Sequence, residues 1–237
     1  MSDSAANILQ LLVPDLVNVS IISVGTVSEL TQSDFSKLAR SSVISELVGS
    51  SPRFDQGIVA DAAGGIVASI TVQGIRSFKA VTLSPVRLEV HNRSGLLNPQ
   101  ENGLPQMARK LFEVAETTGL QAIGVNFEVL IQSSLQSTAA KEIAHRILKP
   151  ELLDFGKIAT FSGISSKFFF ETISGYSSSV SIEPRWNDVD SPTIWIQTNT
   201  NADISDVPDE QFINELYDEA KTVLVDLLTR IGLPVPS

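Results

Sequence analysis

An internal repeat is the feature that most constrains the fold of this 237-residue chain. Residues 17–21 and 125–129 both alternate apolar and polar side chains, as half-buried strands do, and both carry asparagine at the second position, Asn18 and Asn126. Residues 71–74 and 172–175 each close an alternating run with glycine. Residues 106–115 and 211–220 share glutamine, leucine and alanine at matched positions. These three matches keep the same order, with offsets between 101 and 108, and predict a tandem duplication.

Each half of the sequence predicts the same unit: a strand, a helix, three strands and a long helix. We expect residues 1–14 to form an N-terminal arm, residues 15–119 the first copy and residues 120–237 the second. Antiparallel strands with helices packed on one face make an α+β layered fold. The glycines at 74 and 175 are predicted to supply positive φ in hairpin turns. The pattern leaves open whether the copies form one continuous sheet or two packed sheets.

The C-terminal helix has the clearest sequence signals. Asp206 is predicted as its N-cap, Pro208 suits the first turn, and Gly232 marks the end. One apolar stripe at helical spacing consists of Phe212, Leu216, Ala220, Val223, Leu227 and Ile231. Because Leu216 matches Leu111 in the repeat, both leucines are expected to pack a helix on its own sheet.

Two resemblances follow from these segments. The element order, repeated twice, resembles that of the saddle formed by TATA-box-binding protein; this is an analogy of topology and implies no function. Residues 120–127 and 201–205 resemble a sporadically distributed bacterial family of similar length, which has a Gly-Leu-Arg-Tyr-Ile-Asn-like strand in mid-chain and an acidic turn before a long C-terminal helix. When Asn126 is matched to the asparagine of that pattern, Ile123 and Gly124 replace its Arg-Tyr. The resemblance implies no activity, because that family has none assigned.

Charge and composition limit the classes of partner. The net charge of −10 disfavours binding to a phosphate backbone or an anionic membrane, so neither nucleic acid nor membrane is expected as a partner. The absence of cysteine excludes disulfides and thiolate chemistry. The first residues lack the basic segment of a signal peptide, and no apolar run approaches about 18 residues, so a cytoplasmic protein is expected.

No catalytic residue, metal site or cofactor is predicted. The chain has two histidines, His91 and His145, but no Gly-x-Ser-x-Gly elbow. The acidic residues between 188 and 210 lack the alternate spacing and the glycine of a calcium loop. Residues 62–65 contain two glycines but lack the Lys-Ser/Thr of a phosphate-binding loop.

One candidate ligand site is a charged strand face. Arg87, Glu89 and His91 alternate with Leu88 and Val90, so the three polar side chains share one face of a strand. Together with Arg93 they could form a small ligand-binding patch. The alternative interpretation is a solvated strand face stabilised by a cross-strand charge pair.

The candidate interface is an aromatic strand. Phe168, Phe169 and Phe170 place aromatic rings on both faces of one strand, which indicates either a central strand covered on both sides or an interface. Trp186, in a following loop, is a further candidate contact. The leading hypothesis is therefore a non-enzymatic interaction protein that acts through a sheet face or edge and self-associates as a homodimer. The alternative is a small-ligand-binding protein, or a hydrolase that uses carboxylates and His91 in a cleft between the copies.

Overall fold

The computed structural model describes residues 12–26, 31–49, 51–60, 65–133, 139–148, 165–185 and 192–236. In chain order its elements are β1 (Leu12–Gly25), α2 (Gln32–Ala39), α3 (Ser42–Val48), β2 (Pro52–Ala60), β3 (Ile66–Gly74), β4 (Lys79–Ser84), β5 (Arg87–Asn92), α4 (Pro99–Asn102), α5 (Leu104–Val114), β6 (Leu120–Ser133), α6 (Ala139–Ile147), β7 (Ser166–Glu171), β8 (Ser177–Pro184), β9 (Thr193–Asp203) and α7 (Glu210–Arg230). β1 begins at Leu12, so the last three residues of the predicted arm, 12–14, belong to a strand.

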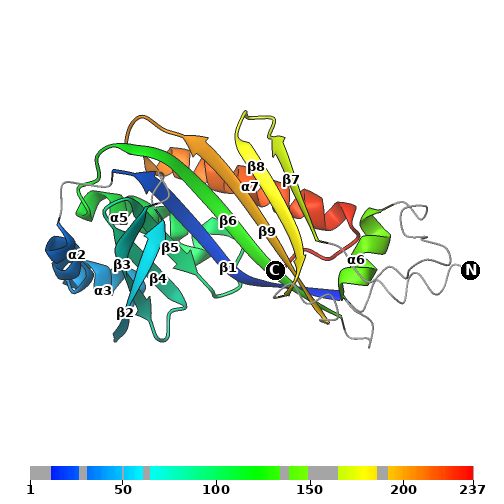
Figure 1. Ribbon diagram of the computed structural model, residues 1–237, viewed down its shortest axis with the longest axis horizontal. Coiled ribbons are helices and arrows are strands. Elements are labelled where there is room, and N and C mark those ends of the chain that lie inside the picture. The colour runs from blue at the N-terminus through cyan, green and yellow to red at the C-terminus, as the bar shows by residue number, and fades with distance from the viewer. Residues whose placement is uncertain are drawn as a thin grey trace, which may run out of the picture.

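The nine strands of the described residues form one antiparallel sheet, in the order β2-β3-β4-β5-β1-β6-β9-β8-β7. The two longest of these strands, β1 and β6, have 14 residues each and lie side by side at its centre (Figure 1). In their register Val19 is directly opposite Phe127. The sequence left open whether the strands form one continuous sheet or two packed sheets, and the described strands form one continuous sheet. The fold is α+β, with more strand than helix.

The two halves do not contain the same elements. The second half has the predicted order of strand, helix, three strands and long helix, from β6 to α7. Among its described residues, the first half has two helices after β1 and then four strands where three were predicted, because β2 pairs with β3 along its whole length. The sequence signal for β2 is weak because this strand lies at the edge of the sheet, where none of its residues is fully buried.

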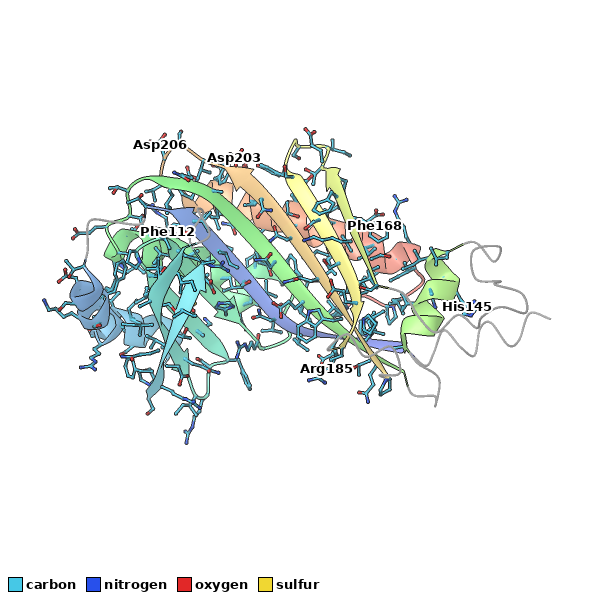
Figure 2. The ribbon with its side chains drawn as sticks, in the orientation of Figure 1. Phe112, His145, Phe168, Arg185, Asp203 and Asp206 are labelled. Carbon is cyan, nitrogen blue, oxygen red and sulfur yellow. The ribbon has the colours of Figure 1, made fainter. Side chains whose placement is uncertain are left out.

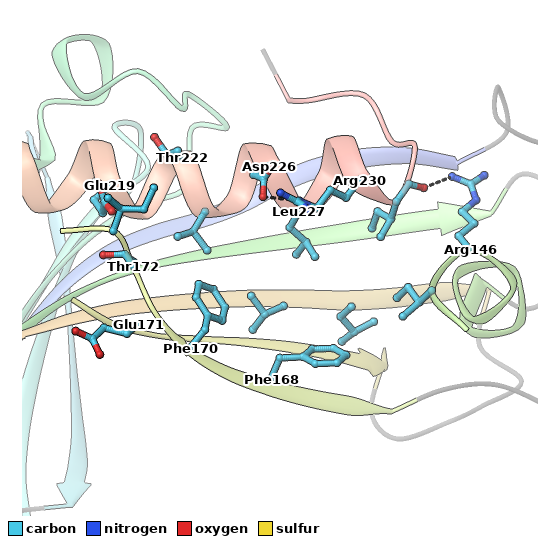
Figure 3. A pocket seen from close by; sticks show the side chains of 16 residues that line it. Arg146, Phe168, Phe170, Glu171, Thr172, Glu219, Thr222, Asp226, Leu227 and Arg230 are labelled. Carbon is cyan, nitrogen blue, oxygen red and sulfur yellow. Dashed lines mark hydrogen bonds and ion pairs between the residues drawn. The ribbon is translucent and has the colours of Figure 1, made fainter. Parts of the chain in front are cut away.

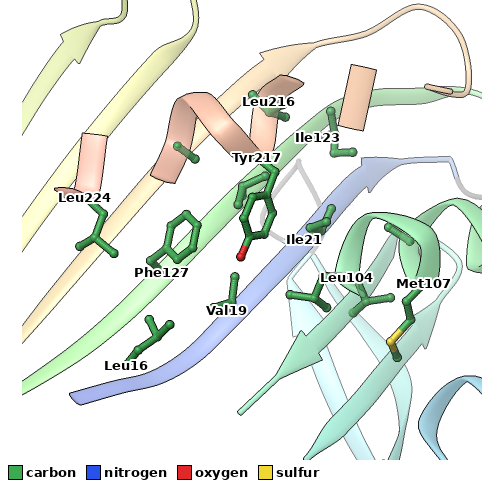
Figure 4. Packing of buried hydrophobic residues seen from close by; sticks show 14 of the residues in the cluster. Leu16, Val19, Ile21, Leu104, Met107, Ile123, Phe127, Leu216, Tyr217 and Leu224 are labelled. Atoms are coloured by element: carbon green, nitrogen blue, oxygen red, sulfur yellow. The ribbon is translucent and has the colours of Figure 1, made fainter. Parts of the chain in front are cut away.

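The helices pack on one face of the sheet. Helices α5 and α7 contact the central strands, α2 and α3 contact β3 and β4, and α6 contacts β6, β8 and β9. Between them and the sheet lies a continuous apolar core, in which the rings of Phe127 and Tyr217 meet edge to face with centroids 5.3 Å apart (Figure 4). Leu111 of α5 and Leu216 of α7 are both fully buried. We call the opposite face, on which none of the described helices packs, the helix-free face.

Helix α7 differs from its prediction in its start and in its buried side. Its N-cap is Asp209 and not Asp206: the Asp209 Oδ1 accepts a 2.8 Å hydrogen bond from the backbone N–H of Phe212. Of the predicted stripe, Leu216 and Ala220 are fully buried, whereas Phe212, Val223 and Leu227 are half-buried. The deepest core positions are Ile213, Leu216, Tyr217, Ala220, Leu224 and Leu228. The apolar arc of α7 is therefore wider than the predicted stripe. One side of the arc is fully buried against the sheet, and its second side, which includes Val223 and Leu227, is half-buried.

Glycine at position 74 serves close packing and not a positive φ. Gly175 has φ of 83°, as predicted for a turn, but Gly74 is the last residue of β3 and has no positive φ; the turn after it places Phe78 at φ of 59°. A Cβ at position 74 would lie 1.8 Å from the carbonyl oxygen of Val48 at the end of α3. Glycine is required because the backbone at the end of α3 approaches the backbone of β3 too closely for a side chain at position 74.

A buried polar network connects α7 to the first half. The Tyr217 hydroxyl donates to the carbonyl oxygen of Leu97 at 3.0 Å and accepts from the Asn102 side-chain amide at 2.6 Å. The Asn92 side chain in turn donates to the Asn102 carbonyl at 2.9 Å. Burial raises the pKa of Tyr217, so its hydroxyl remains protonated and able to donate.

Candidate functional site

The first predicted site lies on β5. Leu88 and Val90 are buried in the core, and Arg87, Glu89 and His91 project from the helix-free face. The Glu89 Oε2 lies 2.8 Å from the His91 Nε2, and the Glu89 Oε1 forms an ion pair with the Arg87 Nε. Both carboxylate oxygens are thus engaged, and only 8% of Glu89 is exposed.

The surroundings of Glu89 favour its ionised form. Burial opposes ionisation, but the hydrogen bond from His91 and the charges of His91 and Arg87 outweigh it, so the pKa of Glu89 lies below its ordinary value. A carboxylate held this way has the properties of a structural ion-pair cluster. It lacks the free lone pairs and the raised pKa that suit a general acid.

Arg93 does not join this cluster. It follows the end of β5, its side chain is exposed, and it forms no ion pair with another described residue. Its backbone N–H is bonded to the carbonyl of Phe78. The structure therefore brings together three of the four predicted residues, and ligand binding by them remains a prediction.

The helix-free face continues as a row of uncharged polar groups across the central strands. Ser20 of β1 lies between His91 and Asn126 in the strand register, and the Asn126 side-chain amide lies 3.5 Å from the Ser20 Oγ. Asn18 and Asn126, the matched asparagines of the predicted repeat, are 8% and 4% exposed. The Oδ1 atom of each is buried and has no hydrogen-bond partner among the described residues.

The predicted aromatic strand is β7, which ends the sheet. Its place in the strand order shows that the interpretation as a central strand is wrong, since only β8 pairs with it among the described residues. Phe168 and Phe170 project to the helix side and are each 42% exposed; Phe169 projects to the helix-free face and is 76% exposed. Figure 2 shows Phe168 on this outermost strand. Trp186, the fourth predicted contact, lies outside the described residues.

A groove of about 740 Å³ separates β7 from α7 (Figure 3). Its apolar lining includes Phe168, Phe170, Val180, Ile182, Val223 and Leu227. Val223 and Leu227 are on the second side of the α7 apolar arc, so the wide arc is the sequence signal that could have located this groove. The lining does not include Arg87, Glu89 or His91.

Charged groups surround the apolar floor of the groove. Arg230 binds Asp226 at 2.6 Å, and Arg146 of α6 donates to the carbonyls of Ile231 and Gly232 at 3.2 Å. Glu171 and Glu219 also line the groove, and neither forms an ion pair with another described residue. The arrangement of an apolar floor with charged groups around it fits a surface that receives apolar side chains.

The remaining candidates for chemistry are separate from one another. Within the described part of the chain, no group of three or more histidine and acidic residues is placed to hold a metal ion. His145 is exposed on α6, and Asp203 and Asp206 lie around the end of β9 (Figure 2). None of the described helices combines the length and apolar character that crossing a membrane requires.

No protein-family model matches this chain, and no curated protein matches it either. The fold and the surface geometry are therefore the basis of the functional argument.

Proposed function

We propose that the chain arose by tandem duplication. The support is geometric as well as sequential: Val19 and Phe127, which are equivalent at the offset of 108, lie directly opposite one another in β1 and β6. Equivalent residues of two copies are expected to lie opposite one another where a twofold axis relates the copies. The outward orders β1-β5-β4-β3 and β6-β9-β8-β7 also correspond strand for strand. Superposing residues 15–118 on 122–231 should align these strands and the helices α5 and α7.

We further propose a non-enzymatic interaction protein that self-associates through the β7 edge and the groove beneath it. The observation that carries the proposal is an edge strand whose outer side is unpaired among the described residues and which bears three exposed phenylalanines beside an apolar groove. Natural proteins usually protect such an edge with charges, proline or a covering segment, because exposed N–H and C=O groups pair readily with another strand. Contiguous exposed apolar surface is typical of an interaction site.

The alternative, a ligand-binding or hydrolytic site at Glu89 and His91, has less support. Both oxygens of Glu89 already have partners within β5, and the groove lies elsewhere. A nucleic-acid partner has little support as well, because the net charge of −10 opposes the phosphate contacts that dominate such binding.

Sedimentation and light scattering at tens of micromolar test the proposal. The parent chain of 25.5 kDa should show twice that mass. Phe169→Asp removes an exposed ring without touching the core and should weaken the dimer by about tenfold or more. Ile58→Asp, at a 69% exposed position on the opposite edge strand β2, is the matched control and should leave the mass unchanged. A parent that sediments as a monomer contradicts the proposal.

A further inference from the structure

We propose that two chains pair through their β7 strands in antiparallel register, centred on Phe169, to form one continuous eighteen-stranded sheet. This inference rests on the proposed self-association through the β7 edge and specifies which residues meet. It is carried by the direction of the free backbone groups and by the order of charges along the strand.

The direction of the free backbone groups follows from the β7–β8 hairpin. The backbone N–H of Thr172 donates to the carbonyl of Tyr176 at 2.8 Å, and the same register pairs Phe168 with Val180. In an antiparallel ladder, alternate residues turn both backbone groups to the same neighbour. Since Thr172 bonds inward, the N–H and C=O groups of Lys167, Phe169 and Glu171 point outward from the sheet.

A second β7 must place outward-pointing residues opposite one another, which restricts the register. Centred on Phe169, the pairing sets Phe169 against the partner's Phe169 and Lys167 against the partner's Glu171. Twofold symmetry repeats the charge pair at the other end of the strand. The neighbouring permitted registers, centred on Phe168 or Phe170, place Phe169 opposite the partner's Lys167 or the partner's Glu171 and leave no charge pair.

Side-chain chemistry agrees with the central register on both faces. Phe168 meets the partner's Phe170 on the helix side, where both rings border the groove, and such aromatic cross-strand pairs stabilise sheets. Lys167 and Glu171 alternate with Phe168 and Phe170 along the strand, and Glu171 also borders the groove at the end of β7. Neither forms an ion pair with another described residue, so both are available to a partner strand. The Lys167 Nζ already lies 5.2 Å from the centre of the Phe169 ring, along this same edge.

Charge reversal tests the register without disturbing the core. Lys167→Glu places two acidic pairs in the dimer, Glu171→Lys places two basic pairs, and each should weaken association about tenfold. The double variant should recover the parent affinity. Mixing the two single variants should also recover it, because each chain then meets the opposite charge at both ends. Lys221→Glu makes the same change in net charge as Lys167→Glu on α7, outside the groove lining, and should have no effect.

The outcomes separate the register from the proposed function. A parent dimer whose affinity is lowered by the single variants but not restored by the double variant or the mixture overturns the register and leaves self-association standing. If the parent is a dimer and the two single variants, the double variant and the mixture all associate as tightly as the parent, the register is also overturned and self-association stands. A parent monomer overturns both.

A second measurement uses the absence of cysteine from the chain. Phe169→Cys introduces one thiol, which the register places beside its own copy, so a short bis-maleimide should link two chains efficiently. Ile58→Cys, similarly exposed on the β2 edge, should not be linked. Linkage through Ile58→Cys alone would assign the interface to the other edge and overturn the inference.

Discussion

The two outer edges of the sheet differ in what their charged side chains contact. On β2, Arg53 and Asp55 bind each other at 3.0 Å, and Pro52 begins the strand. On β7, Lys167 and Glu171 have no such partner among the described residues and flank three exposed phenylalanines. The proline and the internally paired charges of β2 disfavour addition of another strand, which supports the proposed association through β7.

The helices beside the two edges differ as well. On the β2 side, α3 approaches so closely that the carbonyl of Val48 occupies the space above Gly74. On the β7 side, α7 lies over β9 and β6, and its half-buried Val223 and Leu227 border the groove. The two ends of the sheet therefore differ: α3 packs closely on the β2 end, and the β7 end has an accessible apolar surface.

The largest expected effect tests whether the two halves use their long helices in the same way. Leu216→Ala in α7 and Leu111→Ala in α5 each remove a fully buried side chain and leave a cavity, at a cost of about 2–5 kcal/mol in the free energy of unfolding. Denaturant melts should show similar losses if the positions are equivalent. Lys221→Ala is the control, with an expected change of about 0.5 kcal/mol or less. A Leu216→Ala protein as stable as the parent would contradict the layered packing.

A smaller loss in the free energy of unfolding is expected at a position where the two halves have different residues. Tyr217→Phe keeps the ring against Phe127 but removes the hydroxyl that serves Leu97 and Asn102, so about 1–3 kcal/mol should be lost. The matched position in α5 is already a phenylalanine, Phe112. Urea melts of Tyr217→Phe provide the measurement. No loss in stability would mean that the network does not connect the halves energetically.

The smallest effect concerns Glu89 and depends on pH. Because the folded pKa of Glu89 is depressed, its contribution is present above the pKa of the unfolded chain and disappears as the pH falls through the folded pKa. Glu89→Gln should therefore cost about 1 kcal/mol at neutral pH and less in acid, as the parent carboxyl becomes protonated. Melts of both proteins across this range check the sign. A difference that grows toward acid would contradict the ion-pair assignment.

The sequence predicted those features that depend on local periodicity. Alternation located β5 with its buried Leu88 and Val90, and helical spacing located α7 with Leu216 in the core. The position of β7 was undecided, because whether a strand is central or at an edge depends on partners distant in the chain. The role of Gly74 was missed for a similar reason: the backbone that excludes a side chain there belongs to α3.

The groove was not predicted, because periodicity shows which side of a helix is apolar but not how much of that side is buried by neighbouring elements. Val223 and Leu227 belong to the same stripe as Leu216, yet only the last is fully buried. The coverage depends on the position of α7 over β9 and β6, which leaves β7 beyond the helix.

The pairing of β1 with β6 has a consequence for the order of events during synthesis. Val19 leaves the ribosome 108 residues before Phe127, its partner at the centre of the sheet. Until β6 is made, one edge of β1 has no strand to bind, although β5 can already occupy the other. Contacts so distant in sequence are formed slowly, since the intervening chain must be ordered first. The nascent first half is therefore expected to be the stage most in need of chaperone protection, and its central edge to be the region that a chaperone covers.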